Sequence, residues 1–192
     1  LAPPFDAVIG NPPYASAITR ARAPHPAYRS ALQSHYHTAR GSFDLSVPFV
    51  ERAMTLCGEG SRCGLVLPNK LLAADYARAL RSWLGERVTV EAIFDASQER
   101  PFAASIYPVA LVMRNTLPSP CDELSIFQWK QPGFELARCA TQADLYATPG
   151  QSWSCVLDPN WDVLRRCWQH AIPLGEVAGL SSGLTVGEAY LL

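Results

Sequence analysis

The sequence has no long hydrophobic run, no closely paired cysteines and almost no net charge. No apolar run reaches the roughly 20 residues that a membrane-spanning helix needs, and the first residues lack a signal-peptide pattern. The six cysteines are scattered without a C-x-x-C pair, which argues against the common zinc-site spacings and against a disulfide framework. The formal net charge is -1, so any signal for a nucleic-acid partner has to be local. We therefore expect a cytoplasmic protein with reduced thiols, no metal site and no membrane contact.

Apolar residues, by contrast, are plentiful. They make up 48% of the 192 residues, enough to bury the core of one domain, or of one domain and part of a second. The chain begins with Leu1 rather than Met and ends on the apolar run 189–192. We interpret it as a fragment of a longer polypeptide.

Short apolar runs alternate with segments of helical periodicity. The runs predict strands at 5–9, 63–67, 88–94 and 107–113, and the periodic segments predict helices from about Ser46 to Cys57 and from Leu72 to Trp83. The first run, closed by Gly10, is typical of a buried parallel strand. Helix-spaced connections between apolar strands favour an α/β fold with a mainly parallel sheet, and the short link between the last two strands allows one of them to be antiparallel.

A stiff loop follows the first strand. Asn11-Pro12-Pro13-Tyr14 stands at the carboxyl end of that strand, where open α/β sheets bind their ligands. The two prolines fix φ and remove two backbone donors. What remains is rich in acceptors, namely the side-chain oxygen of Asn11 and the carbonyl of Pro12, with the flat ring of Tyr14 beside them.

Such a loop suits an aromatic amine. The lone pair of an exocyclic amino group is delocalised into its ring, so the nitrogen is a poor nucleophile. Two acceptors that hold its two N–H groups localise the lone pair and aim it, and a stacked ring fixes the plane of the base. An electrophilic methyl group can then be transferred in line, with catalysis coming mostly from positioning. A base inside a duplex has to be flipped out first.

The loop and its strand, Phe5 to Tyr14, resemble the signature of class I, S-adenosylmethionine-dependent DNA adenine-N6 methyltransferases. Further segments over 43–45, 64–69, 73–76 and 80–81 are similar to the methylase core of restriction–modification enzymes, most closely the type IIG group. The resemblance covers about residues 5 to 115. It implies the C-terminal half of a Rossmann-like methyltransferase sheet, followed by a less regular segment that leads into a target-recognition domain.

The resemblance also implies residue roles. In that family the flipped adenine is held by the loop, which maps onto Asn11, Pro12, Pro13 and Tyr14 as catalytic residues. A second aromatic sandwiches the base, for which Phe102 is the candidate and Tyr107 the alternate. The implied cofactor is S-adenosylmethionine, and the implied partner is double-stranded DNA with a flipped adenine.

One departure from the family concerns the methyl donor. The family's Gly-rich loop and acidic residue for the donor lie upstream of the loop strand, where this chain has only ten residues. We therefore expect the cofactor-binding residues to lie mostly outside this chain, the fragment alone to be inactive, and a nuclease domain to be possible in the same parent chain. The expected domains are 1–117 (C-terminal half of the methyltransferase domain), 118–172 (irregular α+β extension or linker) and 173–192 (start of the target-recognition domain).

A local basic segment follows the loop. Between Asp6 and Asp44 there is no acidic residue, and tyrosines and histidines are interleaved with four arginines: Arg20, Arg22, Arg29 and Arg40. We interpret this stretch as a DNA-binding segment in which Arg contacts phosphate and Tyr stacks on bases. The alternative is an ordinary solvated loop.

Three functions stay open at this point. The first is a DNA adenine-N6 methyltransferase within restriction–modification or phage defence. The second is a protein glutamine-N5 methyltransferase, because that family also uses Asn-Pro-Pro-Tyr and an amide nitrogen needs the same two acceptors. The third is a DNA-binding fragment without catalytic activity. The basic segment and the long tail after Asn115 favour the first.

Overall fold

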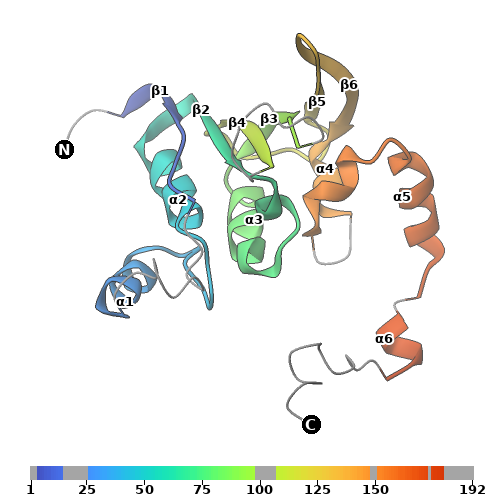
Figure 1. The fold of residues 1–192 in the computed structure, drawn as a ribbon, viewed down its shortest axis with the longest axis horizontal. Coiled ribbons are helices and arrows are strands. Elements are labelled where there is room, and N and C mark those ends of the chain that lie inside the picture. Colours follow the sequence, from blue (N-terminus) through green and yellow to red (C-terminus); the bar gives the residue numbers. More distant parts are fainter. Residues whose placement is uncertain (1–3, 15–25, 98–106, 148–150, 173, 180–192) are drawn as a thin grey trace. The chain divides into compact units, whose positions relative to one another are not determined.

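A computed structural model describes residues 4–14, 26–97, 107–147, 151–172 and 174–179. In this part of the chain one six-stranded sheet has the order β1-β2-β4-β3-β5-β6 (Figure 1). Its strands are β1 (Phe5–Gly10), β2 (Cys57–Pro68), β3 (Thr89–Asp95), β4 (Pro108–Arg114), β5 (Glu123–Lys130) and β6 (Gly133–Thr141). The mixed α/β architecture confirms the predicted fold class.

Four strands of the sheet run in the same direction. β1 is parallel to β2, and β3 is parallel to β5, whereas β4 is antiparallel to both β2 and β3, between which it lies. Leu111 of β4 is thus in register with Leu65 on one side and with Ile93 on the other. This confirms that one of the last two predicted strands is antiparallel. The carboxyl ends of β1, β2, β3 and β5 share one edge of the sheet, the edge at which ligands bind in open α/β folds.

The helices lie between and after the strands. They are α1 (Pro26–His35), α2 (Ser46–Leu56), α3 (Arg78–Gly85), α4 (Gln142–Tyr146), α5 (Trp161–His170) and α6 (Leu174–Val177), with the short 3-10 turns η1 (Asn69–Leu72), η2 (Asp75–Ala77) and η4 (Trp153–Leu157). α2 begins at Ser46 as predicted, because Pro48 falls in the first turn, where the backbone N–H has no partner within the helix. α2 packs on β1 and β2.

The predicted helix from Leu72 to Trp83 was wrong at its start. Only Arg78–Gly85 is α-helical, and the residues before it form η1 and η2. The cause is Arg81, whose side chain is fully buried. Its guanidinium donates to the carbonyl of Leu71 at 2.7 Å and to that of Ala74 at 3.0 Å. These carbonyls therefore accept hydrogen bonds from Arg81 instead of from the backbone N–H groups of a longer helix.

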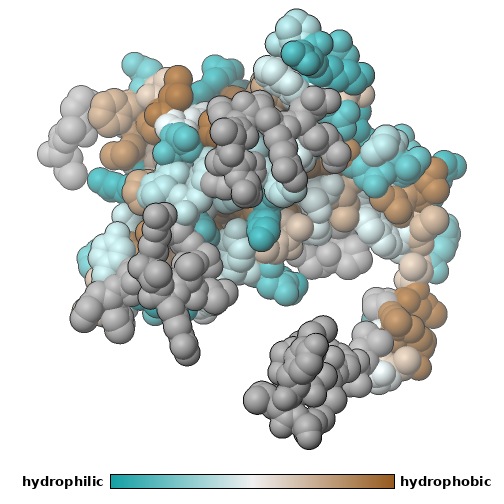
Figure 2. Space-filling model, in the orientation of Figure 1, coloured by the Kyte–Doolittle hydropathy of each residue, from teal (hydrophilic) through white to brown (hydrophobic). Residues whose placement is uncertain are grey.

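Strand β1 is exposed, against the expectation of a buried strand. Ile9 is 88% exposed and Phe5 53% exposed, and Figure 2 shows hydrophobic residues gathered over β1. The reason is that β1 is an edge strand of the described sheet: β2 pairs with one side only. The core lies elsewhere, between the middle strands and the helices, and includes Val47, Val50, Leu65, Leu67, Leu80, Leu84, Ile93, Leu111 and Met113.

The sheet continues beyond residue 118. β5 pairs in parallel with β3, and β6, which the sequence did not indicate, pairs with β5. The chain divides into two compact units, Leu1–Pro159 and Asn160–Leu192. The three domain ranges drawn from the sequence stay predictions. None of the helices in the described ranges is long and apolar enough to cross a membrane.

Candidate active site

The Asn-Pro-Pro-Tyr loop leaves β1 at the carboxyl edge of the sheet. Within it, Pro12 is buried, Tyr14 is half-buried, and Asn11 and Pro13 are exposed. The exposed amide of Asn11 is therefore presented to solvent by a backbone that two prolines keep extended and stiff. This is the arrangement of a preformed acceptor rather than of a flexible turn.

The hydroxyl of Tyr14 ties the loop to the neighbouring strand. It lies 2.6 Å from the side-chain oxygen of Asn11 and 2.9 Å from the carbonyl oxygen of Val66 in β2. A phenol has one proton to donate, so the two oxygens compete for it. When the proton goes to Val66, the oxygen of Asn11 is free to accept from a ligand, and the Tyr14 ring stays fixed in place.

The phenol of Tyr14 stays protonated at physiological pH. Burial raises its pKa, and the negative charge of Asp44 raises it further. The same two causes raise the pKa of Tyr76 to about 12. Asp44 precedes α2, where its carboxylate accepts the backbone N–H of Ser46 at 2.8 Å. Both tyrosines are therefore neutral at physiological pH.

An apolar hollow of about 290 Å³ borders the loop. The loop side is formed by Asn11, Pro12 and Pro13, and the helix side by residues of α2 that include Phe49 and Arg52. The Asn11 amide thus stands at the rim of a hydrophobic surface. A flat or apolar group that rests in the hollow would meet a hydrogen-bond acceptor at its edge.

The end of the basic segment is held on α2 by a buried acid. Glu51 is 3% exposed and accepts the backbone N–H of His37 at 3.0 Å and that of Thr38 at 2.9 Å. It also accepts the Thr38 hydroxyl at 2.7 Å. Backbone donors thus surround this carboxylate, and in return it fixes where the segment joins the sheet domain.

Two of the four arginines proposed for DNA contact lie in described residues. Arg29 of α1 donates to the carbonyl of Gly41, and its guanidinium stands 5.6 Å from the centre of the Phe43 ring. Arg40 is exposed and donates to the carbonyl of His37 at 2.9 Å. Arg29 therefore also has a role within the fold, whereas Arg40 presents its charge to solvent.

The remaining predicted residues fall elsewhere. Arg20, Arg22 and Phe102 lie outside the described residues, so their roles stay predictions. Tyr107, the alternate stacking residue, is 42% exposed, and its carbonyl accepts the N–H of Asn69 at 2.8 Å. This bond joins the entrance of β4 to the turn after β2, on the same edge as the loop.

Sequence reasoning missed two groups. The Val66 carbonyl carries no signal in a sequence, because every residue has one. Glu51 did carry a signal: it is an acid on the helix face that also bears Val47, Val50 and Met54, all buried. An acid at such a position needs hydrogen-bond partners, and the pattern could have indicated that it binds a neighbouring segment.

Comparison with known proteins identifies similar methylases. Residues 2–102 match the family model of the Eco57I restriction-modification methylase. The type II methyltransferase M.PaeR7I of Pseudomonas aeruginosa is 30% identical over 114 residues, which are 57% of this chain and 19% of that protein. The type II restriction enzyme and methyltransferase RM.Eco57I of Escherichia coli is 23% identical over 93% of this chain and 18% of its own length. The chain thus spans about a fifth of these relatives.

Solved structures show the same fold. The type IIG restriction endonuclease BpuSI superposes with a TM-score of 0.59 at 17% identity, over 87% of this chain and 22% of that one. A Listeria monocytogenes protein described as a class I S-adenosylmethionine-dependent methyltransferase superposes with a TM-score of 0.54 at 15% identity, over 84% of this chain and 44% of that one.

Proposed function

Because the chain belongs to the Eco57I restriction-modification methylase family, we propose that it forms the methyl-acceptor side of an enzyme that methylates adenine N6 in DNA. The observation that carries this proposal is the loop geometry: an exposed Asn11 oxygen beside a Tyr14 hydroxyl that has a second acceptor, Val66. The relatives named as type II methyltransferases support DNA as the substrate.

The residues of this chain hold and orient the amine. The Asn11 oxygen and the Pro12 carbonyl each accept one N–H of the amino group, while the Tyr14 hydroxyl donates to Val66 and keeps the ring in place. The nitrogen lone pair is thereby directed out of the plane of the base. Both acceptors gain strength as the nitrogen becomes positive, so they favour the transition state over the ground state.

The methyl donor is S-adenosylmethionine, which supplies an electrophilic methyl group when bound. The loop and the apolar hollow fit the acceptor side of such a reaction. The ten residues before Asn11 contain no glycine-rich loop, so the donor's own binding residues are not in this stretch. We therefore assign no residue of the chain to the donor, and we propose that most of the donor site lies elsewhere in a longer enzyme.

The test is the chemical identity of the product. The enzyme that contains this chain is incubated with methyl-labelled S-adenosylmethionine and mixed-sequence duplex DNA, and the DNA is digested to nucleosides. We expect the label in N6-methyladenine. Label in N4-methylcytosine, or none in DNA, would contradict the proposal.

A parallel incubation with a glutamine-containing release-factor peptide tests the protein-methylation alternative. Label on the peptide and not on DNA would favour a glutamine methyltransferase. DNA binding without any transfer would favour a fragment without catalytic activity.

A further inference from the structure

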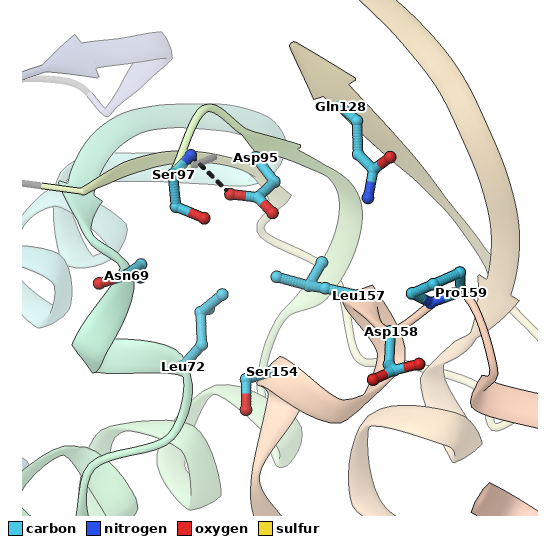
Figure 3. A pocket seen from close by; sticks show the side chains of 9 residues that line it. All are labelled: Asn69, Leu72, Asp95, Ser97, Gln128, Ser154, Leu157, Asp158 and Pro159. Carbon is cyan, nitrogen blue, oxygen red and sulfur yellow. Dashed lines mark hydrogen bonds between the residues drawn. The ribbon is translucent and has the colours of Figure 1, made fainter. Parts of the chain in front are cut away.

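A second cavity opens on the carboxyl edge of the sheet, apart from the Asn-Pro-Pro-Tyr loop. Its volume is about 450 Å³, within the usual range for small-molecule sites (Figure 3). Asn69, directly after β2, and Asp95, the last residue of β3, line it. Gln128 of β5 is in register with Asp95, and it lines the same cavity. The cavity is thus built on the ends of three parallel strands.

Asp95 is the polar centre of this cavity. It is 6% exposed, and one of its oxygens accepts the backbone N–H of Ser97 at 2.9 Å. Figure 3 shows its other oxygen turned toward the space between Gln128 and Leu157. Among the described residues, no basic side chain forms an ion pair with Asp95. A buried carboxylate in this position favours a ligand that donates a hydrogen bond.

The rest of the lining limits what that ligand can be. None of the described lining residues is basic, which disfavours phosphate. Leu72 and Leu157 offer apolar surface, and Gln128 offers an amide that both donates and accepts. Acid and amide side chains beside apolar walls are the groups that read nucleobases: Asp accepts from the amino group of cytosine, and Asn or Gln pairs with adenine.

The position of the cavity fits the same substrate as the loop. β1 and β3 are three strand spacings apart in the sheet order, so the two sites are separated by about 14 Å along one edge. A DNA strand places one nucleotide per about 3.4 Å of helix axis. A duplex or displaced strand that presents a base to the Asn-Pro-Pro-Tyr loop therefore has other bases within reach of the cavity.

We propose that this cavity is a second base-binding pocket, which accepts a DNA nucleobase bearing an exocyclic amino group. The free oxygen of Asp95 accepts from that amino group, the amide of Gln128 contacts the neighbouring ring atom, and Leu72 and Leu157 pack against the ring. The inference rests on the proposed DNA substrate, but it concerns a base other than the one that is methylated.

The test exploits two bases that differ in the group that Asp95 would read. Fluorescein-labelled oligo-dC and oligo-dU, each eight nucleotides long, are titrated with the enzyme that contains this chain, and binding is followed by anisotropy. Cytosine carries an amino group where uracil carries a carbonyl. We expect oligo-dC to bind at least about fivefold more tightly than oligo-dU. The acceptors of the Asn-Pro-Pro-Tyr loop also favour an amino group over a carbonyl, so the cavity variants decide which site carries the preference.

Substitution of Asp95 should reverse this preference. In Asp95→Asn the oxygen that accepts the Ser97 N–H is retained, and an amide N–H₂ now faces the cavity, so uracil should bind as tightly as cytosine or more tightly. Gln128→Glu adds a second acceptor and should raise the dC-to-dU ratio by about twofold or more. Asp75→Asn removes an exposed acid paired with Arg78 at 2.9 Å and should leave the ratio unchanged.

The outcomes separate this inference from the proposed function. Equal binding of oligo-dC and oligo-dU by the unaltered enzyme, or an unchanged ratio in both Asp95→Asn and Gln128→Glu, would overturn the pocket even if adenine is methylated. Free deoxycytidine that binds as tightly as oligo-dC would overturn DNA as the source of the base. A reversed preference would support the pocket whether or not N6-methyladenine is formed, because no methyl donor is present.

Discussion

At the scale of single residues, the site depends on how one hydroxyl proton is shared. The Tyr14 phenol can donate either to Asn11 at 2.6 Å or to Val66 at 2.9 Å, and it stays protonated because burial and Asp44 raise its pKa. The phenol can therefore release the Asn11 oxygen without losing its hydrogen-bond acceptor. Releasing the Asn11 oxygen costs little free energy, because the Tyr14 hydroxyl then donates to the carbonyl of Val66 instead.

Asn11→Ala should abolish most methyl transfer and leave DNA affinity nearly intact. Asn11 has little to offer the phosphate backbone, which supplies much of the affinity. By analogy with an oxyanion-hole donor, losing this acceptor should slow the reaction about 100- to 1000-fold. Single-turnover rates and binding isotherms on the same duplex measure the two effects separately. Near-normal turnover would mean that the loop is structural.

Tyr14→Ala and Tyr14→Phe should differ from each other. The alanine variant loses a stacking surface worth about 1–3 kcal/mol, so both binding and rate should fall. The phenylalanine variant keeps the ring and loses only the hydroxyl that contacts Asn11 and Val66, so it should retain most binding. Fluorescence of 2-aminopurine at the target position reports the stacking. Equal losses in the two variants would assign the effect to the hydroxyl instead.

Much of this site could be predicted from the sequence. The position of the loop after β1 follows from a short apolar run closed by Gly10 and two prolines, which are local signals. The partner of Tyr14 could not be predicted, because Val66 lies 52 residues away and joins only through the sheet. The cavity around Asp95 was missed for the same reason: its residues come from four separate stretches of the chain.

At the scale of elements, buried charged side chains determine where segments begin and end. Arg81 determines the start of α3 by binding carbonyls of the preceding turns, and it also donates to the carbonyl of Gln151 at 2.7 Å. Glu51 determines the end of the basic segment by accepting backbone N–H groups. In both cases a charged side chain replaces hydrogen bonds that a regular helix would have made.

Arg81→Met should lower the free energy of unfolding by about 2–4 kcal/mol, because carbonyls of Leu71 and Gln151 lose their donor in a buried region. Arg87→Met, on an arginine whose side chain is 49% exposed, should change it by no more than about 0.5 kcal/mol. Urea unfolding of the 192-residue chain, followed by circular dichroism, compares the two. Equal urea midpoints for the Arg81→Met and Arg87→Met variants would show that Arg81 is not needed for stability.

The arginines of the basic segment should act through their charge. Replacing Arg20, Arg22 and Arg29 together by Ala should weaken DNA binding equally across sequences and lower the salt dependence by roughly one unit of slope per lost phosphate contact. Arg29→Ala alone serves as a control, because this arginine also contacts Gly41 and Phe43. If the triple variant keeps the original slope, the segment does not contact DNA.

Elements were predicted well where burial imposes a pattern and poorly where it does not. The start of α2 at Ser46 follows from Pro48 and the apolar spacing. β6 gave no such signal, because most of its side chains are exposed. An edge strand with solvent on both faces does not need alternating apolar and polar residues. β1 differs in the opposite way. Its apolar sequence predicts a buried strand, but most of its side chains are exposed in the described sheet.

At the scale of the whole molecule, the proposed function assigns to the chain the acceptor side of a reaction with two substrates. The matched residues make up 19% of M.PaeR7I and 18% of RM.Eco57I, so both relatives are several times longer than the chain. The apolar edge at β1 and the loop next to it lie at one end of the sheet, and the Asp95 cavity lies toward the other.

The 192-residue chain by itself should bind S-adenosylmethionine weakly or not at all, since the residues before Asn11 contain no glycine-rich loop. Isothermal titration calorimetry on the chain should give no saturable heat at tens of micromolar donor. S-adenosylhomocysteine, titrated alongside, should behave in the same way. A dissociation constant in the low micromolar range would mean that the chain contains a donor site of another kind.

The insertion of β4 between β2 and β3 has a consequence for synthesis on the ribosome. β2 and β3 leave the exit tunnel before β4, yet neither pairs directly with the other, because β4 supplies the hydrogen bonds to both. Domains fold as they emerge, beginning from their N-terminal side. The edges of β2 and β3 that pair with β4 therefore stay without hydrogen bonds until β4, which ends at Arg114, has left the tunnel. Nascent chains stalled before that point should be the ones that chaperones bind and proteases cut.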